Sequence, residues 1–157
     1  MTFTERRVAI VGGGPAGLSA AIELRRLGVE RVTVYEREQR AGGIPRHTNH
    51  LGFGTRDLHR MTTGPRYARS LIDRAQRAGA ELRLATPVFS LDDLDADAVI
   101  LATGVRERPR AARLVPGDRP TGIFTTGSVQ QLSMAGRRVG SRAVIVGAEH
   151  EIGRAHV

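Results

Sequence analysis

The sequence contains no cysteine among its 157 residues. This absence excludes a redox disulphide, a thiolate nucleophile and a cysteine-ligated metal within this chain. The exclusion applies to these residues only, and a cysteine pair in a longer chain is left open. What remains is 40% hydrophobic residues, which is compatible with a domain that has a core of its own.

Lysine is also absent, because all 24 basic residues are arginine, and aromatic side chains make up only 4% of the chain. The formal net charge of +8 raises the question of a nucleic-acid partner. Nucleic-acid-binding surfaces combine a basic patch with aromatic side chains on which bases stack. Here the arginines are spread over most of the length without such a motif, so we expect no nucleic-acid partner.

Long hydrophobic runs are missing as well. No run reaches the length that crosses a membrane, and the first predicted strand begins within a few residues of Met1, with no apolar signal segment. The sequence therefore predicts no membrane segment, and a cytoplasmic location is the default expectation.

A glycine-rich motif is the most informative feature that is present. The apolar run Val8–Val11 passes directly into G-G-G-P-A-G at residues 12–17 and then into a helical pattern. In such a strand–turn–helix unit, Gly12 permits the sharp turn, Gly14 lets the backbone approach a diphosphate, and Gly17 lets the helix pack on the strand. The N–H groups and the dipole at the helix start favour the anion.

An acidic residue follows at an informative distance. The second predicted strand, residues 31–36, ends in Glu36, nineteen residues after Gly17. A carboxylate at about this spacing accepts hydrogen bonds from the ribose hydroxyls of an adenine nucleotide. The alternative is an ordinary strand-to-helix turn with a surface glutamate.

The order of predicted elements indicates an α/β fold. We predict strands at residues 6–11, 31–36, 81–86 and 97–102, helices at 15–27 and 65–78, an irregular stretch near 37–63, and a connection rich in Pro, Gly and Arg near 104–122. The alternation predicts a Rossmann-like parallel sheet with helices on both faces. The acidic stretch at 89–97 is expected to be a solvated turn rather than a cation site.

Four motifs, in this order, resemble those of the flavoproteins with two dinucleotide-binding domains, the pyridine nucleotide-disulphide oxidoreductase superfamily. They are G-G-G-P-A-G at residues 12–17, Glu36-Arg37, Ala41-Gly42-Gly43-Ile44 and V-I-L-A-T-G at residues 99–104. Residues 43–54 and 63–68 are similar to a cysteine-free branch that includes flavoproteins associated with glycerol-3-phosphate dehydrogenases and subunits of opine oxidase, sarcosine oxidase and hydrogen cyanide synthase. The resemblance implies the FAD/NAD(P)-binding fold and an FAD-dependent oxidoreductase.

The resemblance also implies a cofactor role for each motif. The first glycine loop would carry the FAD pyrophosphate, Glu36 the adenosine ribose, and Gly42-Gly43 the backbone beside the ribityl chain. The main chain of Val88 would lie near adenine, and residues 102–104 would close the next strand end against the cofactor. The expected cofactor-binding residues are Gly12, Gly14, Pro15, Ala16, Gly17, Glu36, Arg37, Gly42, Gly43, Arg46, Val88, Ala102, Thr103 and Gly104.

Candidate chemical side chains follow the second glycine pair. His47 and His50 could orient a substrate, tune the flavin or move a proton, or they could be loop histidines bonded to the backbone. Arg46 could contact a phosphate or a substrate carboxylate, or be a bystander. We expect no metal site, because His47 and His50 have no evident third ligand, although His59 lies nearby. No catalytic residue is assigned, because a flavin carries out the transfer itself.

Residues 141–147 repeat the apolar-run-to-glycine pattern. This resembles the opening of a second, NAD(P)-type domain, but Glu149 stands where a second glycine is expected, which argues against NAD(P) binding there. We expect residues 1–124 to be the N-terminal part of an FAD-binding domain, 125–140 a connection and 141–150 the start of the second domain. Residues 151–157 look like translated sequencing adapter, so the sequence is expected to be an N-terminal fragment with a truncated fold.

Three functions are compatible with these patterns. The first is an FAD-dependent oxidoreductase, inactive as a fragment, whose longer form oxidises an amine, amino-acid, opine or polyol-phosphate-derived donor or exchanges electrons with NAD(P)H. The second is an NAD-binding Rossmann protein without flavin, and the third is a non-catalytic subunit or binding module. Pro15-Ala16 and residues 102–104 favour the first. The expected partners are a small-molecule substrate and a partner subunit or second copy.

Overall fold

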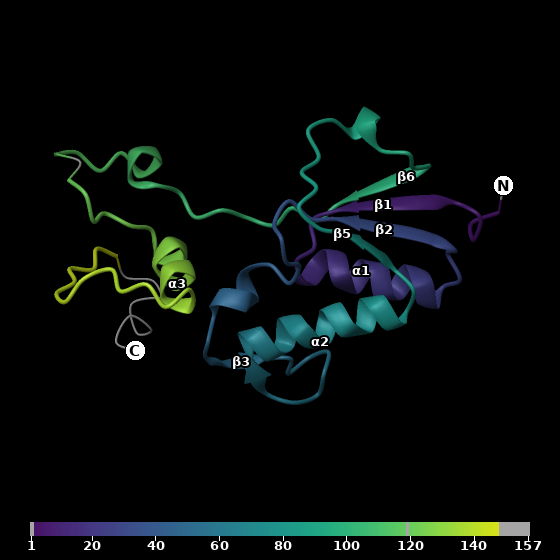
Figure 1. The fold of residues 1–157 in the computed structure, drawn as a ribbon, viewed down its shortest axis with the longest axis horizontal. Helices are drawn as coiled ribbons and strands as arrows, with labels where there is room; N and C mark the ends of the chain where they lie inside the picture. Colours follow the sequence, from purple (N-terminus) through teal and green to yellow (C-terminus); the bar gives the residue numbers. More distant parts are fainter. Residues whose placement is uncertain (1, 119, 148–157) are drawn as a thin grey trace. The chain divides into compact units, whose positions relative to one another are not determined.

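The computed structural model describes residues 2–118 and 120–147. The chain divides into two compact units, Met1–Val105 and Arg106–Val157, and each is described here by itself. Figure 1 shows the path of the chain, with the elements of the first unit at its N-terminal end. No helix among the described residues is long and apolar enough to span a membrane.

The first unit is built on a four-stranded parallel sheet. Its strands, in spatial order, are β5 (Glu81–Arg83), β2 (Arg31–Tyr35), β1 (Arg7–Val11) and β6 (Ala98–Leu101). The central strand β1 sets the register, with Val8 opposite both Val32 of β2 and Ala98 of β6. Because the carboxyl ends of parallel strands meet at one edge, the loops that follow β1, β2 and β6 are gathered there.

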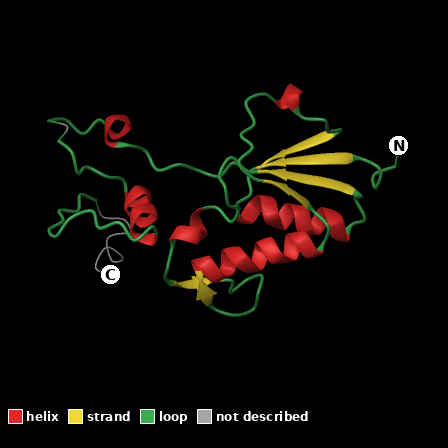
Figure 2. Ribbon diagram, in the orientation of Figure 1, coloured by secondary structure: helices red, strands yellow, loops and turns green. Residues whose placement is uncertain are grey.

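Two helices cover this sheet, α1 (Pro15–Arg26) and α2 (Gly64–Arg77). Both turn an apolar stripe into one core cluster, whose largest fully buried side chains are Ile10, Leu18, Val29, Val34 and Leu71. The Rossmann-like parallel fold is therefore confirmed, with one difference. Figure 2 shows α1 and α2 on the same side of the sheet, so the expectation of helices on both faces is wrong for the described residues. The reason is that the two helices share a single core.

The segment expected to be irregular contains short elements. They are the 3-10 turn η1 (Ile44–His47) and the antiparallel strands β3 (Leu51–Phe53) and β4 (Thr62–Thr63). Two- and three-residue strands are too short for an alternating pattern to be recognised. The strand predicted at 81–86 also ends early, because Ala85 adopts a positive φ of 52° and turns the chain out of the ladder.

The second unit contains the 3-10 turn η3 (Arg110–Arg113) and α3 (Thr126–Met134). The Thr125 hydroxyl caps α3 by accepting the Ser128 N–H at 3.3 Å. The apolar run at 141–147 forms no strand within the described chain, and Val144 is 93% exposed. An apolar run without a neighbouring strand has no ladder to satisfy its backbone. Glu149 and the rest of 148–157 lie outside the described residues, and the boundary at 124 stays a prediction.

Asp97 joins the start of β6 to the start of β1. Its carboxylate accepts the Arg7 backbone N–H at 2.7 Å and pairs with the Arg7 guanidinium at 2.9 Å. These hydrogen bonds lower the pKa of Asp97 from its ordinary value of 3.8 to about 2. The contact therefore stabilises the fold fully above pH 4, and its contribution is lost as the pH falls through 2.

We expect Asp97→Asn to lower the midpoint of thermal unfolding above pH 4 and to lose that deficit relative to the native chain as the pH falls toward 2. Circular dichroism melts of both proteins from pH 7 to pH 2 measure the difference. A deficit that stays constant across this range would contradict the role of the ionised Asp97 carboxylate.

Candidate functional site

Two glycines at the β1–α1 connection, Gly12 and Gly17, could not be replaced by another residue without a shift of backbone. Gly12 has a φ of +113° and donates its N–H to the Tyr35 carbonyl at 2.8 Å. A Cβ on Gly12 would lie 2.3 Å from the Ala102 carbonyl oxygen, and a Cβ on Gly17 would lie 1.9 Å from the Gly12 oxygen. The turn and the close approach of α1 to β1 both depend on the absence of side chains.

Gly14 differs from these two glycines, because the protein leaves room beside it. Gly14 is the N-cap of α1 in an extended conformation, and a Cβ there would find only the Gly43 Cα, at 3.9 Å. No side chain caps the start of α1, and no acidic residue occupies its first turn. An uncapped helix N-terminus beside open space is suited to an anion.

The second glycine pair packs directly on the first glycine loop. Gly42 donates its N–H to the Gly13 carbonyl at 2.7 Å, and a Cβ on Gly43 would lie 3.0 Å from the Gly14 Cα. Gly42 and Gly43 have φ values of 112° and 60°. The first glycine loop and Gly42-Gly43, almost thirty residues apart in the chain, therefore form one surface of main-chain atoms without side chains.

Glu36 lies beside this surface. Its side chain is buried, with one carboxylate oxygen accepting the Gly13 N–H at 2.9 Å and the other accepting the Glu38 N–H at 3.0 Å. Each carboxylate oxygen has a further lone pair that can accept a hydroxyl. The arrangement orients a negative acceptor next to the glycine loop, where a ribose would follow a diphosphate.

The segment that leads to Val88 runs alongside Glu36. Thr86 donates its N–H to the Glu36 carbonyl at 2.8 Å, and Ala85 donates to the Glu38 carbonyl at 2.9 Å. Val88 follows two residues later and is half-buried. Within the described chain its backbone N–H and carbonyl form no hydrogen bond, which leaves both groups for a ligand.

The end of β6, which is predicted to close the site, also lies at the carboxyl-end edge of the sheet. Ala102 donates its N–H to the Val11 carbonyl at 2.8 Å, and its own carbonyl lies against the glycine turn. Thr103 and Gly104 continue outward and are exposed, with Gly104 at a φ of 69°. Arg37 is exposed and forms no hydrogen bond or ion pair with the part of the chain that the structure describes.

The guanidinium group of Arg46 has partners within the protein. It forms an ion pair with Glu38 and donates to the Gly43 carbonyl at 3.3 Å, with the side chain 17% exposed. This pairing favours the interpretation of Arg46 as a support for the second glycine pair over a direct phosphate contact. Burial and the neighbouring Arg46 lower the pKa of His47, while Glu38 opposes them. The lowered pKa favours the neutral form of the His47 imidazole.

His50 belongs to an aromatic cluster that the sequence patterns do not indicate. Its Nδ1 donates to the Leu51 carbonyl at 2.7 Å, and its ring centroid lies 5.3 Å from that of Phe53, which lies 5.8 Å from that of Tyr67. Burial and the Asp57 carboxylate raise the pKa of Tyr67 to about 12. Among the described residues, no three His, Asp or Glu side chains lie close enough together to hold a metal ion.

The chain is similar to known proteins over most of its length. Residues 6–149 match the model of the family described as pyridine nucleotide-disulphide oxidoreductase. The glutamate synthase [NADPH] small chain of Mycobacterium tuberculosis is 37% identical over 123 residues, which cover 73% of this chain and 23% of that protein. An opine oxidase subunit of Rhizobium meliloti is 34% identical over an alignment of 167 positions, covering 89% of this chain and 30% of that protein.

Among solved structures, 6-hydroxypseudooxynicotine amine oxidase from Pseudomonas geniculata superposes with a TM-score of 0.55 at 21% identity, covering 87% of this chain and 20% of that one. At this identity the likeness supports the fold alone. The chain spans less than a third of the length of these three proteins.

Proposed function

The chain belongs to the pyridine nucleotide-disulphide oxidoreductase family, and on this premise we propose that its first unit binds the ADP half of FAD in an FAD-dependent oxidoreductase. The observation that carries the proposal is the contact between the two glycine segments beside a buried Glu36. Beside this contact, the uncapped start of α1, the open space at Gly14 and the Glu36 carboxylate follow one another in the order that a diphosphate and its ribose require.

Each part of the site has a distinct task in this proposal. The uncapped start of α1, with Gly14, Pro15, Ala16 and Gly17, receives the diphosphate. Glu36 accepts the ribose hydroxyls, and the free backbone of Val88 meets the adenine edge. Gly42-Gly43 and residues 102–104 flank the chain of the cofactor as it leaves the diphosphate. When bound, the flavin would supply hydride or electron transfer, while these residues hold and orient it.

The substrate and partners are part of the proposal. The relatives include an opine oxidase subunit, so we propose an amine, amino-acid or opine donor for the longer protein. The same relatives are named as a small chain and a subunit, which supports a partner subunit. Binding of NAD(P) at a second site depends on residues after Gly147, which lie outside the described part of the chain.

FAD titration of the 157-residue chain, followed by flavin fluorescence, tests the proposal. Saturable binding is expected, and ADP should compete with FAD while riboflavin should not, because the described residues contact the ADP half. Absence of binding, or equal competition by riboflavin, would overturn the assignment. Tighter binding of NAD⁺ than of FAD would instead favour the alternative, a Rossmann protein without flavin, since a carboxylate such as Glu36 serves either nucleotide.

We expect Glu36→Gln to weaken FAD binding by about 10- to 150-fold, because hydrogen bonds to a charged group contribute roughly 1.5–3 kcal/mol. The amide keeps one oxygen for the Gly13 N–H, so the loop should retain its shape. Equilibrium dialysis against FAD gives the dissociation constant. The matched control is Glu30→Gln, at an exposed glutamate just before β2, and this variant should bind FAD normally. If both variants bound FAD with equal affinity, Glu36 would not be the residue that binds the ribose.

A further inference from the structure

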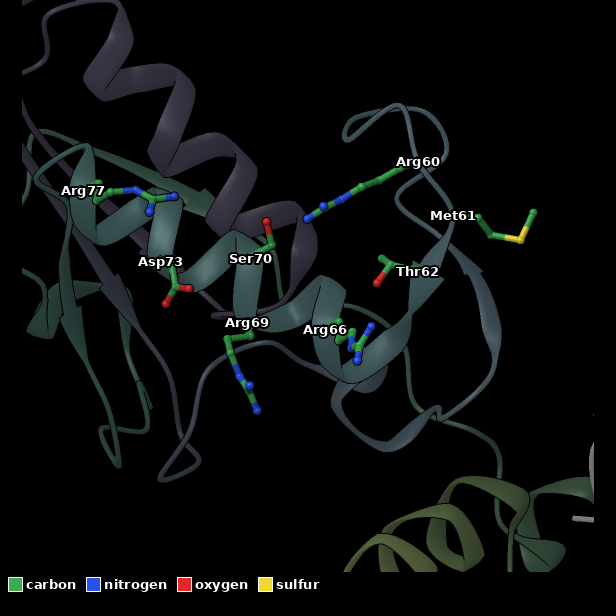
Figure 3. A pocket seen from close by; sticks show the side chains of 8 residues that line it. All are labelled: Arg60, Met61, Thr62, Arg66, Arg69, Ser70, Asp73 and Arg77. Atoms are coloured by element: carbon green, nitrogen blue, oxygen red, sulfur yellow. The ribbon is translucent and has the colours of Figure 1, made fainter.

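A groove of about 360 Å³ lies on the outer side of α2, formed by that helix and the loop that precedes β4 (Figure 3). We call it the arginine groove. Its charged residues and one apolar residue are Arg60, Met61, Arg66, Arg69, Asp73 and Arg77. The helix residues among them are exposed, because the opposite stripe of α2 is turned into the core. The proposed FAD site does not use this surface.

The charges of the arginine groove are not compensated within the described chain. None of its four guanidinium groups forms an ion pair with a described carboxylate, and Asp73 pairs with no described arginine. Elsewhere in the same unit, arginines such as Arg7 and Arg83 do find acidic partners. The groove therefore has a formal charge of +3 that is available to an external anion.

The length of this charged surface favours an extended ligand. Arg66 and Arg77 are eleven residues apart on α2, which corresponds to about 16 Å at a rise of 1.5 Å per residue. Figure 3 shows the four guanidinium groups spread along the groove rather than directed at one point. One phosphate or carboxylate group cannot contact both ends, so the matching ligand has several negative charges along its length.

Two further features distinguish a protein ligand from a nucleic acid. Asp73 lies between Arg69 and Arg77, and its carboxylate would repel a uniformly negative phosphodiester backbone. Met61 is 63% exposed at the loop side of the groove, and both Met and Arg are enriched in protein–protein interfaces. We propose that the arginine groove docks an acidic segment of another protein, with one basic residue facing Asp73 between flanking acidic residues.

Fluorescence anisotropy with a synthetic helical peptide tests the proposal on the 157-residue chain. The probe has glutamates along one face and a single lysine at its centre. We expect salt-sensitive binding that the double variant Arg66→Glu, Arg69→Glu weakens by about tenfold or more, since attraction is replaced by repulsion at two positions. Arg31→Glu, an exposed arginine at the start of β2, changes the net charge without touching the groove and should have a small effect.

Reversal of the central charge provides the decisive comparison. Asp73→Lys should weaken binding of the lysine-centred peptide and strengthen binding of an otherwise identical peptide with glutamate at the centre. The proposal is overturned if Asp73→Lys shifts both affinities in the same direction, or if the Arg31 control loses as much affinity as the double variant. It is also overturned if a single-stranded oligonucleotide binds more tightly than the peptide and is equally sensitive to the double variant.

Discussion

Gly14→Glu is expected to abolish FAD binding while the first unit stays folded. A Cβ at this position meets no protein atom closer than 3.9 Å, and the extended backbone of Gly14 is accessible to any residue. The new carboxylate would therefore occupy the open space at the start of α1, where the diphosphate is proposed to lie. Like charges brought together at a desolvated contact cost several kcal/mol, so the dissociation constant for FAD should rise by more than about 100-fold.

Flavin fluorescence titration measures this loss, and circular dichroism verifies the fold. Ser19→Glu adds the same charge to an exposed position in the second turn of α1 and should retain FAD binding. If Gly14→Glu bound FAD as well as the Ser19 variant, the diphosphate would have to lie elsewhere.

Gly17→Ala is expected to have the largest effect on stability. Its Cβ would lie 1.9 Å from the Gly12 carbonyl oxygen and 3.2 Å from a methyl group of Ile10, so α1 would have to move away from β1. Overpacked cores usually lose 1–3 kcal/mol, and we expect about 3 kcal/mol or more here because the contact is with backbone. That loss is a large part of the total stability of a small domain, which is roughly 5–15 kcal/mol.

Thermal and urea unfolding of Gly17→Ala and Gly14→Ala give the comparison directly. Both variants add one methyl group to the same turn of α1, but Gly14 has room for it, so Gly14→Ala should change the unfolding free energy by less than about 0.5 kcal/mol. Equal destabilisation of the two variants would show that the space beside Gly14 is not free in solution.

Much of the first unit can be predicted from local patterns. The β1–α1 turn is recognisable because an apolar run, three spaced glycines and a helical pattern follow one another without a gap. The strand β6 is a short apolar run, and β2 is rich in β-branched residues, which favour strands. In contrast, the run at 141–147 has the same composition but no partner strand in the described chain, so its pattern is a poor guide to structure.

The side chains around the second glycine pair are harder to predict, because their environment comes from distant residues. The position of Arg46 in the sequence is compatible with a phosphate contact. In the structure, however, its guanidinium forms an ion pair with Glu38 and donates to the Gly43 carbonyl. Phe53 of β3 contacts Tyr67 of α2, and β3 has too few residues to show a recognisable strand pattern. Neither pairing can be inferred from spacing.

The prediction of a diphosphate loop and the absence of cysteine from these residues are properties of the sequence. The first follows from spaced glycines, whose steric freedom is local, and the second from composition alone. Long-range packing establishes the rest: the contact of Gly42-Gly43 with the first loop, the burial of Glu36 beside Gly13, and the arginines along α2 that pair with no described carboxylate. These contacts depend on how separate segments pack at the edge of the sheet and on the surface of α2. The spacing of residues along the chain does not determine that packing.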